Sequence, residues 1–228
     1  MNEHTVKSFD DDISQLRGLI AQMGGLAEVA IQGAMTALVR HDSEAAQRVV
    51  EDDRKIDALE AQVDQLAVQI IALRAPMADD LREVVAALKI SGVVERIGDY
   101  AKNIAKRSAA VEGRSRIEPL TLLPAMSEIA AAMVHDVLDA YAARDAEKAS
   151  AVIARDQKVD NFYDSIFRNL VSHMMENPTT ISSAAQLLFV AKNLERIGDH
   201  ATNIAEMVHY AATGTHPAER ERGTGGPA

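Results

Sequence analysis

One eleven-residue phrase occurs twice: ERIGDYAKNIA at 95–105 returns as ERIGDHATNIA at 195–205. The match extends upstream, because HDSEAAQRVVEDDRKID (41–57) aligns with RDAEKASAVIARDQKVD (144–160) at an offset of 103. The phrases themselves lie 100 residues apart, so the second copy is three residues shorter between the two matches. Loops tolerate such differences in length, which predicts a turn within 74–80 and another within 176–183. The chain therefore contains two repeats of about 100 residues each.

Apolar residues recur at helical spacing inside each repeat. In the first repeat a seven-residue spacing joins Val49, Ile56, Val63 and Ile70, with Leu59, Leu66 and Leu73 between them. This spacing predicts a long helix that packs along one stripe. In the repeated phrase, Ile97, Ala101 and Ile104 mark the face expected in the core. Breaks near 41–43, Pro76, 144 and Pro178 divide each repeat into three helices, because proline cannot continue a helix interior.

Composition agrees with helices. Aromatic residues make up 4% of the chain and Trp is absent, whereas an all-β fold needs aromatic and β-branched strands. We predict an all-α fold of two tandem pseudo-repeated three-helix bundles, with six long antiparallel helices. The expected domains are 8–113 and 117–212. The remaining residues, 213–228, show no periodicity and are expected to form a disordered tail.

Charge and cysteine content limit the partners. The net charge of −10 disfavours nucleic acid and anionic lipid, so we expect membrane contact only through partner proteins. No cysteine is present, which excludes thiolate metal sites and fits a reducing compartment. The first residues show no signal-peptide pattern and no run of about 18 apolar residues occurs. These features predict a cytoplasmic protein.

Acidic residues recur four positions apart in both repeats. The first repeat has Asp53 and Asp57, then Glu95, Asp99 and Asn103; the second has Asp156 and Asp160, then Glu195, Asp199 and Asn203. Consecutive helices reverse direction, which can bring the acids of each repeat face to face. Oxygen ligands without cysteine suit hard cations, so we predict a metal site in each repeat. The alternative is that the acids face water and are neutralised locally by Arg54, Arg96 and Lys102.

Two further residue pairs in the repeated phrase invite explanation. Gly98 and Gly198 interrupt good helices at a cost of about 1 kcal/mol relative to Ala. Close helix packing is the favoured explanation, and room for a ligand is the other. Arg96 and Arg196 either support the acids or bind a partner.

The doubled phrase, together with the upstream acid pairs, resembles the PhoU family over about residues 8–212. The resemblance implies a cytoplasmic helical protein that binds the ATPase subunit of the phosphate ABC transporter and a phosphate-sensing histidine kinase. It also implies metal held by the acidic motifs; iron, zinc, manganese and magnesium are the expected candidates. The implied role is negative regulation of phosphate uptake and of the phosphate-starvation response.

Other classes of function have weaker support in the residues. A ferritin-like di-iron site needs two Glu-x-x-His motifs, and only Glu206 to His209 supplies one on a suitable helix, since its repeat equivalent is Lys106 to Ala109. A purely structural scaffold with solvated acids is the third class. No phosphate-binding loop or nucleophile motif occurs, so we expect no enzyme activity. Exposed apolar positions on long helices favour a homodimer.

Overall fold

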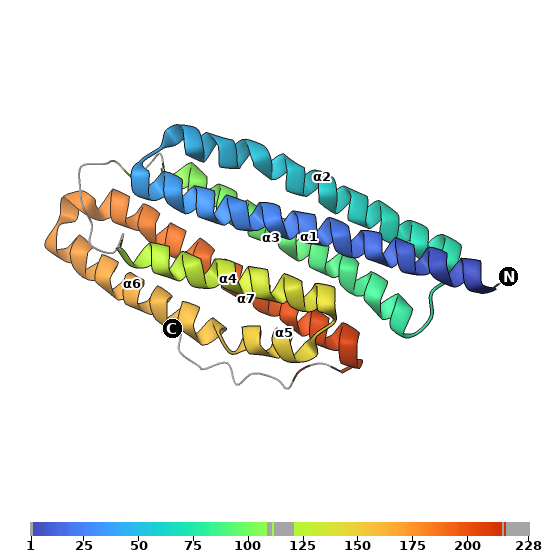
Figure 1. The fold of residues 1–228 in the computed structure, drawn as a ribbon. Helices are drawn as coiled ribbons and strands as arrows, with labels where there is room; N and C mark the ends of the chain where they lie inside the picture. The colour runs from blue at the N-terminus through green and yellow to red at the C-terminus, as the bar shows by residue number, and fades with distance from the viewer. Residues whose placement is uncertain (1, 109–110, 112–120, 216, 218–228) are drawn as a thin grey trace.

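The computed structural model describes residues 2–108, 111, 121–215 and 217, with side chains from residue 9 onward. All regular structure in these residues is helical, as predicted (Figure 1). The first repeat forms α1 (Asn2–Arg40), α2 (Ser43–Arg74) and α3 (Asp79–Ser108). The second forms α4 (Leu122–Ala143), α5 (Ala146–Ile153), α6 (Asp156–Glu176), a 3₁₀ turn η2 (Pro178–Thr180) and α7 (Ile181–Thr213). The boundary between the two expected domains (113 to 117) and most of the predicted tail (216 and 218–228) lie outside the described residues.

The first turn is built alike in both repeats. His41 and Arg144, which are equivalent, adopt left-handed backbone angles with φ of 53° and 54° and so end the preceding helix. The next residue caps the following helix: an oxygen of Asp42 accepts a hydrogen bond from the backbone N–H of Ala45 at 2.9 Å. Asp145 does the same for Lys148, also at 2.9 Å. Such caps stabilise a helix by about 1 kcal/mol each, and they fix the breaks near the positions that the sequence predicts.

The second helix of the second repeat differs from the prediction because it is divided into α5 and α6. The backbone keeps right-handed helical angles at Ala154 and Arg155, but the N–H of Arg155 bonds to the carbonyl of Val152, three residues back, at 3.0 Å. A guanidinium nitrogen of Arg155 also binds Asp136 of α4 at 2.5 Å. The division is a local 3₁₀-like tightening, and α6 continues in the direction of α5 (Figure 1).

The buried stripe of α2 contains an acid. Val49, Ile56, Val63 and Ile70 are buried as predicted, whereas Leu73 is 71% exposed, so its place in the stripe was wrong. The stripe also includes the position four residues after Val49 and three before Ile56. Asp53 occupies this position and is only 6% exposed. Asp156 takes the equivalent place in α6, also at 6%. The helices thus carry carboxylates on the faces that pack against α3 and α7.

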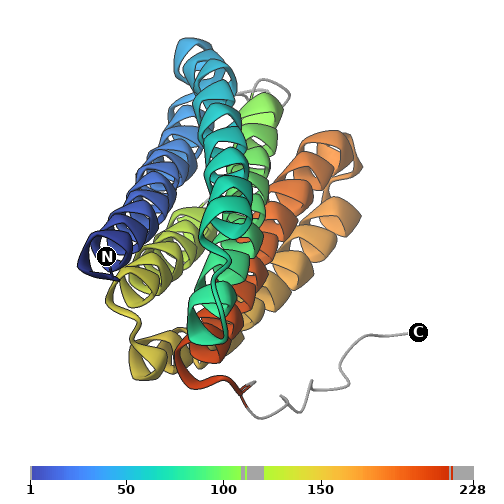
Figure 2. The same ribbon diagram turned by 90° about the vertical axis from the view of Figure 1, so that its right-hand side faces the viewer.

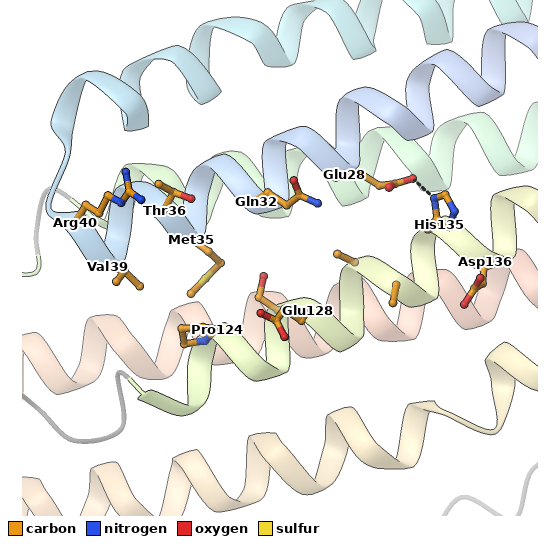
Figure 3. A pocket seen from close by; sticks show the side chains of 13 residues that line it. Glu28, Gln32, Met35, Thr36, Val39, Arg40, Pro124, Glu128, His135 and Asp136 are labelled. Atoms are coloured by element: carbon orange, nitrogen blue, oxygen red, sulfur yellow. Dashed lines mark hydrogen bonds and ion pairs between the residues drawn. The ribbon is translucent and has the colours of Figure 1, made fainter.

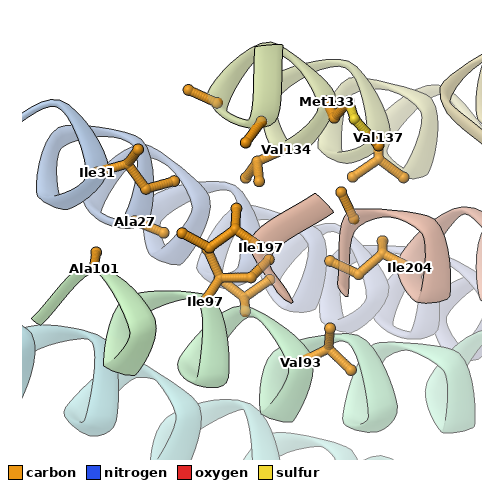
Figure 4. Close-up of a cluster of buried hydrophobic side chains, with 14 of the residues drawn as sticks. Ala27, Ile31, Val93, Ile97, Ala101, Met133, Val134, Val137, Ile197 and Ile204 are labelled. Carbon is orange, nitrogen blue, oxygen red and sulfur yellow. The ribbon is translucent and has the colours of Figure 1, made fainter. Parts of the chain in front are cut away.

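The two bundles share one core. α3 packs against α7 and α1 against α4, so the bundles lie side by side (Figures 1 and 2). Ile97 of α3 and Ile197 of α7 are fully buried between them (Figure 4). Glu83 of α3, 7% exposed, adds a polar link by pairing with Arg17 of α1 and, at 3.3 Å, with Arg144 after α4. Within the described residues, no helix combines the length and apolarity needed to cross a bilayer.

Candidate functional site

The acids of the first repeat meet beside Gly98, where α2 and α3 are in close contact. A β-carbon at Gly98 would lie 2.7 Å from Cδ1 of Ile56 and 3.5 Å from Oδ1 of Asp53. Real β-carbons do not approach a neighbour as closely as 2.7 Å. This contact agrees with close helix packing as the reason for Gly98, and Asp53 of α2 lies beside Asp99 of α3 at this place, since Lys102 bonds to both. We call Asp53, Asp57, Glu60, Glu95 and Asp99 the first cluster.

Lys102 joins the two helices inside the first cluster. Its Nζ donates a hydrogen bond to Asp53 of α2 and another, at 2.5 Å, to Asp99 of α3. Burial lowers the pKa of Lys102, but the hydrogen bonds that it donates to these two carboxylates outweigh burial and raise that pKa above its ordinary value. Lys102 is thus a charged bridge that neutralises Asp53 and Asp99. This is the local neutralisation that the alternative to a metal site expected of Lys102.

The outer acids of the first cluster remain crowded by like charge. Burial, Asp99, Glu60 and Asp57 together raise the pKa of Glu95 to about 7. The pKa of Asp57 is raised by burial and by Asp53, and that of Glu60 by burial and by neighbouring Asp64 and Asp57. Glu60 was not among the predicted residues. Its spacing contains a signal, since Glu60 follows Ile56 by four residues and precedes Val63 by three, as a member of the buried stripe would.

The second repeat brings its four predicted acids together in the same way. A β-carbon at Gly198 would lie 3.3 Å from Cγ1 of Val159 and 3.5 Å from Oδ1 of Asp156. Loss of solvent, together with Glu195, Asp156 and Asp160, raises the pKa of Asp199 to about 6. The mutual influence shows that these carboxylates share one small region between α6 and α7. We call Asp156, Asp160, Glu195 and Asp199 the second cluster.

The residues around the second cluster differ from those around the first. Thr202 stands at the position of Lys102; it is 2% exposed and its hydroxyl has no hydrogen-bond partner. Oε2 of Glu195 is also buried without a partner, while Oε1 accepts a hydrogen bond from Nζ of Lys192 at 2.6 Å. The unpaired Oε2 of Glu195, a member of the cluster, is what a cation site offers, because buried polar groups are normally satisfied. The second cluster therefore fits a hard cation better than the first.

In each repeat an asparagine follows the acids of the last helix. Asn103 is half-buried and Asn203 is exposed, one turn beyond Asp99 and Asp199. Among the residues that the structure describes, no three acids or histidines converge as metal ligands do. The structure therefore gathers the predicted acids on facing helices, and the bound metal stays a prediction.

Arginines and aromatic rings meet where the two repeats join. Tyr100 and His200 are equivalent residues, and their ring centroids lie 5.1 Å apart across α3 and α7. Arg196 is exposed, with its guanidinium 5.7 Å from the ring centroid of Tyr100. Burial lowers the pKa of His200, and the charges of Arg96 and Arg196 add to that shift. Both predicted arginines therefore flank the seam between the repeats.

A separate pocket lies between α1 and α4 (Figure 3). Its walls include Gln32 and Met35 of α1 and Glu128 of α4, and at one end Glu28 contacts His135 at 3.2 Å. No residue of either acidic cluster lines this pocket. The pocket and the clusters are therefore distinct features of the molecule.

Comparisons with known proteins agree with this architecture. The PhoU domain model matches residues 20–108 and again 123–208, one match in each repeat. A "phosphate-specific transport system accessory protein PhoU homolog" from Zymomonas mobilis is 54% identical, covering 96% of this chain and 93% of that protein. The corresponding homolog from Caulobacter vibrioides is 46% identical, covering 94% of each chain.

Two solved structures share the fold. PhoU from Pseudomonas aeruginosa superposes with a TM-score of 0.87 at 38% identity, covering 91% of this chain and 100% of that one. The phosphate transport system regulatory protein PhoU from Streptococcus pneumoniae gives a TM-score of 0.86 at 26% identity, covering 92% of this chain and 99% of that one. Since both repeats match the domain model and relatives align over nearly their full length, the chain belongs to the PhoU family.

Proposed function

We propose that this protein is a cytoplasmic accessory regulator of phosphate transport, without enzyme activity of its own. It lowers phosphate uptake and the phosphate-starvation response when phosphate is plentiful. Its partners are the ATPase subunit of the phosphate ABC transporter and a phosphate-sensing histidine kinase. The observation that carries the proposal is the full-length match to relatives named as accessory proteins of the phosphate-specific transport system.

The physical basis of such regulation is differential binding. A regulator changes the balance between active and silent partners only if it binds one state more tightly, and a nearly complete shift needs about 5.5 kcal/mol of preference. Helices of 30 to 39 residues in the first repeat offer long surfaces for this purpose. Arg96 and Arg196 flank the seam between the repeats and are our candidates for contacts with carboxylates of a partner.

We further propose that a hard cation supports this surface. Asp53, Asp57, Glu95 and Asp99 with Asn103, and Asp156, Asp160, Glu195 and Asp199 with Asn203, are the proposed ligands. The ion is divalent or trivalent: iron, zinc, manganese or magnesium. When bound, it supplies positive charge that holds two acidic helix faces together. The support for this proposal is the crowding of like charges and the buried Oε2 of Glu195, which has no hydrogen-bond partner.

Pairing of two copies is also part of the proposal. Several large apolar side chains remain exposed on α2 and α6, among them Val68 at 61%, Phe167 at 45% and Met175 at 79%. Covering such side chains in a homodimer removes apolar surface from water.

The test is genetic. Deleting the gene in its host, with no second copy present, should raise phosphate-starvation transcripts in phosphate-rich medium, because the silencing partner is lost. The parent gene should restore silence, and a copy with Asp99→Asn and Asp199→Asn should restore it poorly. Transcripts that stay low in the deletion strain would contradict the proposed function.

A matched control tests whether the loss of any two acidic charges, rather than of the clusters, impairs the regulation. Asp52 of α2 and Asp164 of α6 are exposed acids on the helices that carry Asp53 and Asp156. A copy with Asp52→Asn and Asp164→Asn loses the same charge from the two repeats and should restore silence as well as the parent gene. Equal failure of both double variants would show that the clusters have no special role.

A further inference from the structure

The two acidic clusters have equivalent aspartates at their centre, but the lysine that bridges these aspartates in the first cluster has no counterpart in the second. Asp53 and Asp99 of the first cluster correspond to Asp156 and Asp199 of the second. Lys102, three residues after Asp99, is replaced by Thr202 in the second repeat. The repeats thus provide an internal comparison in which four acids are kept, Glu60 is replaced by Tyr163, and the positive charge of Lys102 is lost.

Lys102 lies where the helices of the first cluster come closest. Its ammonium binds one carboxylate on α2 and one on α3, the latter at 2.5 Å, and its side chain is only 22% exposed. The carboxylate of Asp53 is 7% exposed. A fixed ammonium between two carboxylates already provides the charge neutralisation and the helix-to-helix link that a metal ion would provide there. A divalent ion that used the same oxygens would have to displace the ammonium, and the two cations would then repel each other at short range.

The second cluster has a lysine as well, but it is placed differently. Lys192 precedes Glu195 by three residues, so it sits at the other end of the cluster, and it binds only Oε1 of that residue, on its own helix. Its ammonium lies 5.2 Å from the ring centroid of Tyr163, and its side chain is 40% exposed. Lys192 therefore leaves Oε2 of Glu195 without a partner.

We infer that the clusters are unequal: Lys102 is the built-in counter-ion of the first cluster, and a divalent cation binds preferentially at the second. This inference rests on the cation binding proposed above and adds which repeat holds the ion and why. The first repeat is then held together by a permanent charge bridge. The second is held by an exchangeable ion, so the second repeat responds to lower metal concentrations than the first.

The test measures Mn²⁺ affinity by calorimetry at fixed pH and ionic strength, in two variants that each keep one cluster. Asp156→Asn with Asp199→Asn leaves the first cluster, and Asp53→Asn with Asp99→Asn leaves the second. We expect the variant with only the first cluster to bind Mn²⁺ at least about tenfold more weakly. Adding Lys102→Met to that variant should tighten binding at least about tenfold, because the alkyl chain is kept while the competing charge is removed.

Two further variants complete the test. Lys106→Met removes an exposed charge from the same helix one turn on, and it should change the affinity of the first cluster less than twofold. In the variant with only the second cluster, Thr202→Lys should weaken Mn²⁺ binding at least about tenfold. Circular dichroism checks that each variant is folded, and the Lys102→Met comparison stands by itself if Thr202→Lys does not fold.

Each outcome decides between the proposals. Equal affinities of the two clusters, with no effect of Lys102→Met, would overturn this inference and leave the proposed metal binding intact. Equal tightening by Lys102→Met and Lys106→Met would also overturn it, because the effect would then be general electrostatics. If the parent protein binds no Mn²⁺ at all, manganese is not the ion of the proposed site and this inference about a divalent cation is wrong.

Discussion

At the scale of single residues, folding places the carboxylate of Glu95 where its charged form is unfavourable. The pKa of Glu95 is raised from 4.5 to about 7, first by burial and then by Asp99, Glu60 and Asp57. The folded protein therefore binds a proton that the unfolded chain releases, and the stability from this site is lost as pH rises from about 4.5 through about 7. In chelator-treated protein, Glu95→Gln should accordingly raise the free energy of unfolding at pH 7.5, with the gain disappearing near pH 4. Urea denaturation followed by circular dichroism measures this difference.

The difference between the parent protein and Glu95→Gln cancels the contribution of other titrating groups. His200 is one of them, and its lowered pKa makes stability rise with pH, opposite to the effect of Glu95. Glu44→Gln is the matched control, because Glu44 is 89% exposed on α2. It should change the free energy of unfolding by the same small amount at both pH values. A gain for Glu95→Gln that is independent of pH would mean that the Glu95 carboxylate does not titrate in this range.

At the scale of helices, glycine sets how closely two partners pack. A methyl group at Gly98 would overlap Ile56, which is buried, whereas Gly25 on α1 has open space around its β-position. Replacing helical Gly by Ala stabilises by up to about 1 kcal/mol where space allows, and overpacking costs about 1–3 kcal/mol. Gly25→Ala should therefore raise the melting temperature and Gly98→Ala should lower it. Equal increases for both variants would show that the end of the Ile56 side chain can shift without cost.

Much of the helix arrangement could be predicted from the sequence, because helical spacing, turn residues and an internal repeat are local signals. The exposure of Leu73 could not, since it depends on where α2 ends relative to its neighbours. The role of Lys102 could not either: a lysine three residues from an acid can face water or reach across to another helix, and only the distance between α2 and α3 decides. The position of Glu60 on the packed face of α2 could be predicted, because Glu60 lies four residues after Ile56 and three before Val63.

The whole molecule behaves as one packed body, although its sequence is a repeat. Buried residues from both bundles form a continuous core, and Ile97 and Ile197 lie at its centre (Figure 4). Because α3 buries apolar surface against α7 and Glu83 links α1, α3 and the turn after α4, neither bundle can unfold without exposing the other. The repeats should therefore unfold together in a single transition.

Hydrogen exchange can test this cooperativity. Ile97→Ala removes buried apolar volume from the first repeat and should lower the free energy of unfolding by about 2–5 kcal/mol. If the bundles unfold as one unit, the most protected amides of α3 and α7 should lose protection by the same factor. Val68→Ala, at a side chain that is 61% exposed on α2, should leave both unchanged. Loss of protection confined to α1–α3 would show that each repeat folds by itself, and the shared core would then be an interface between two independent domains.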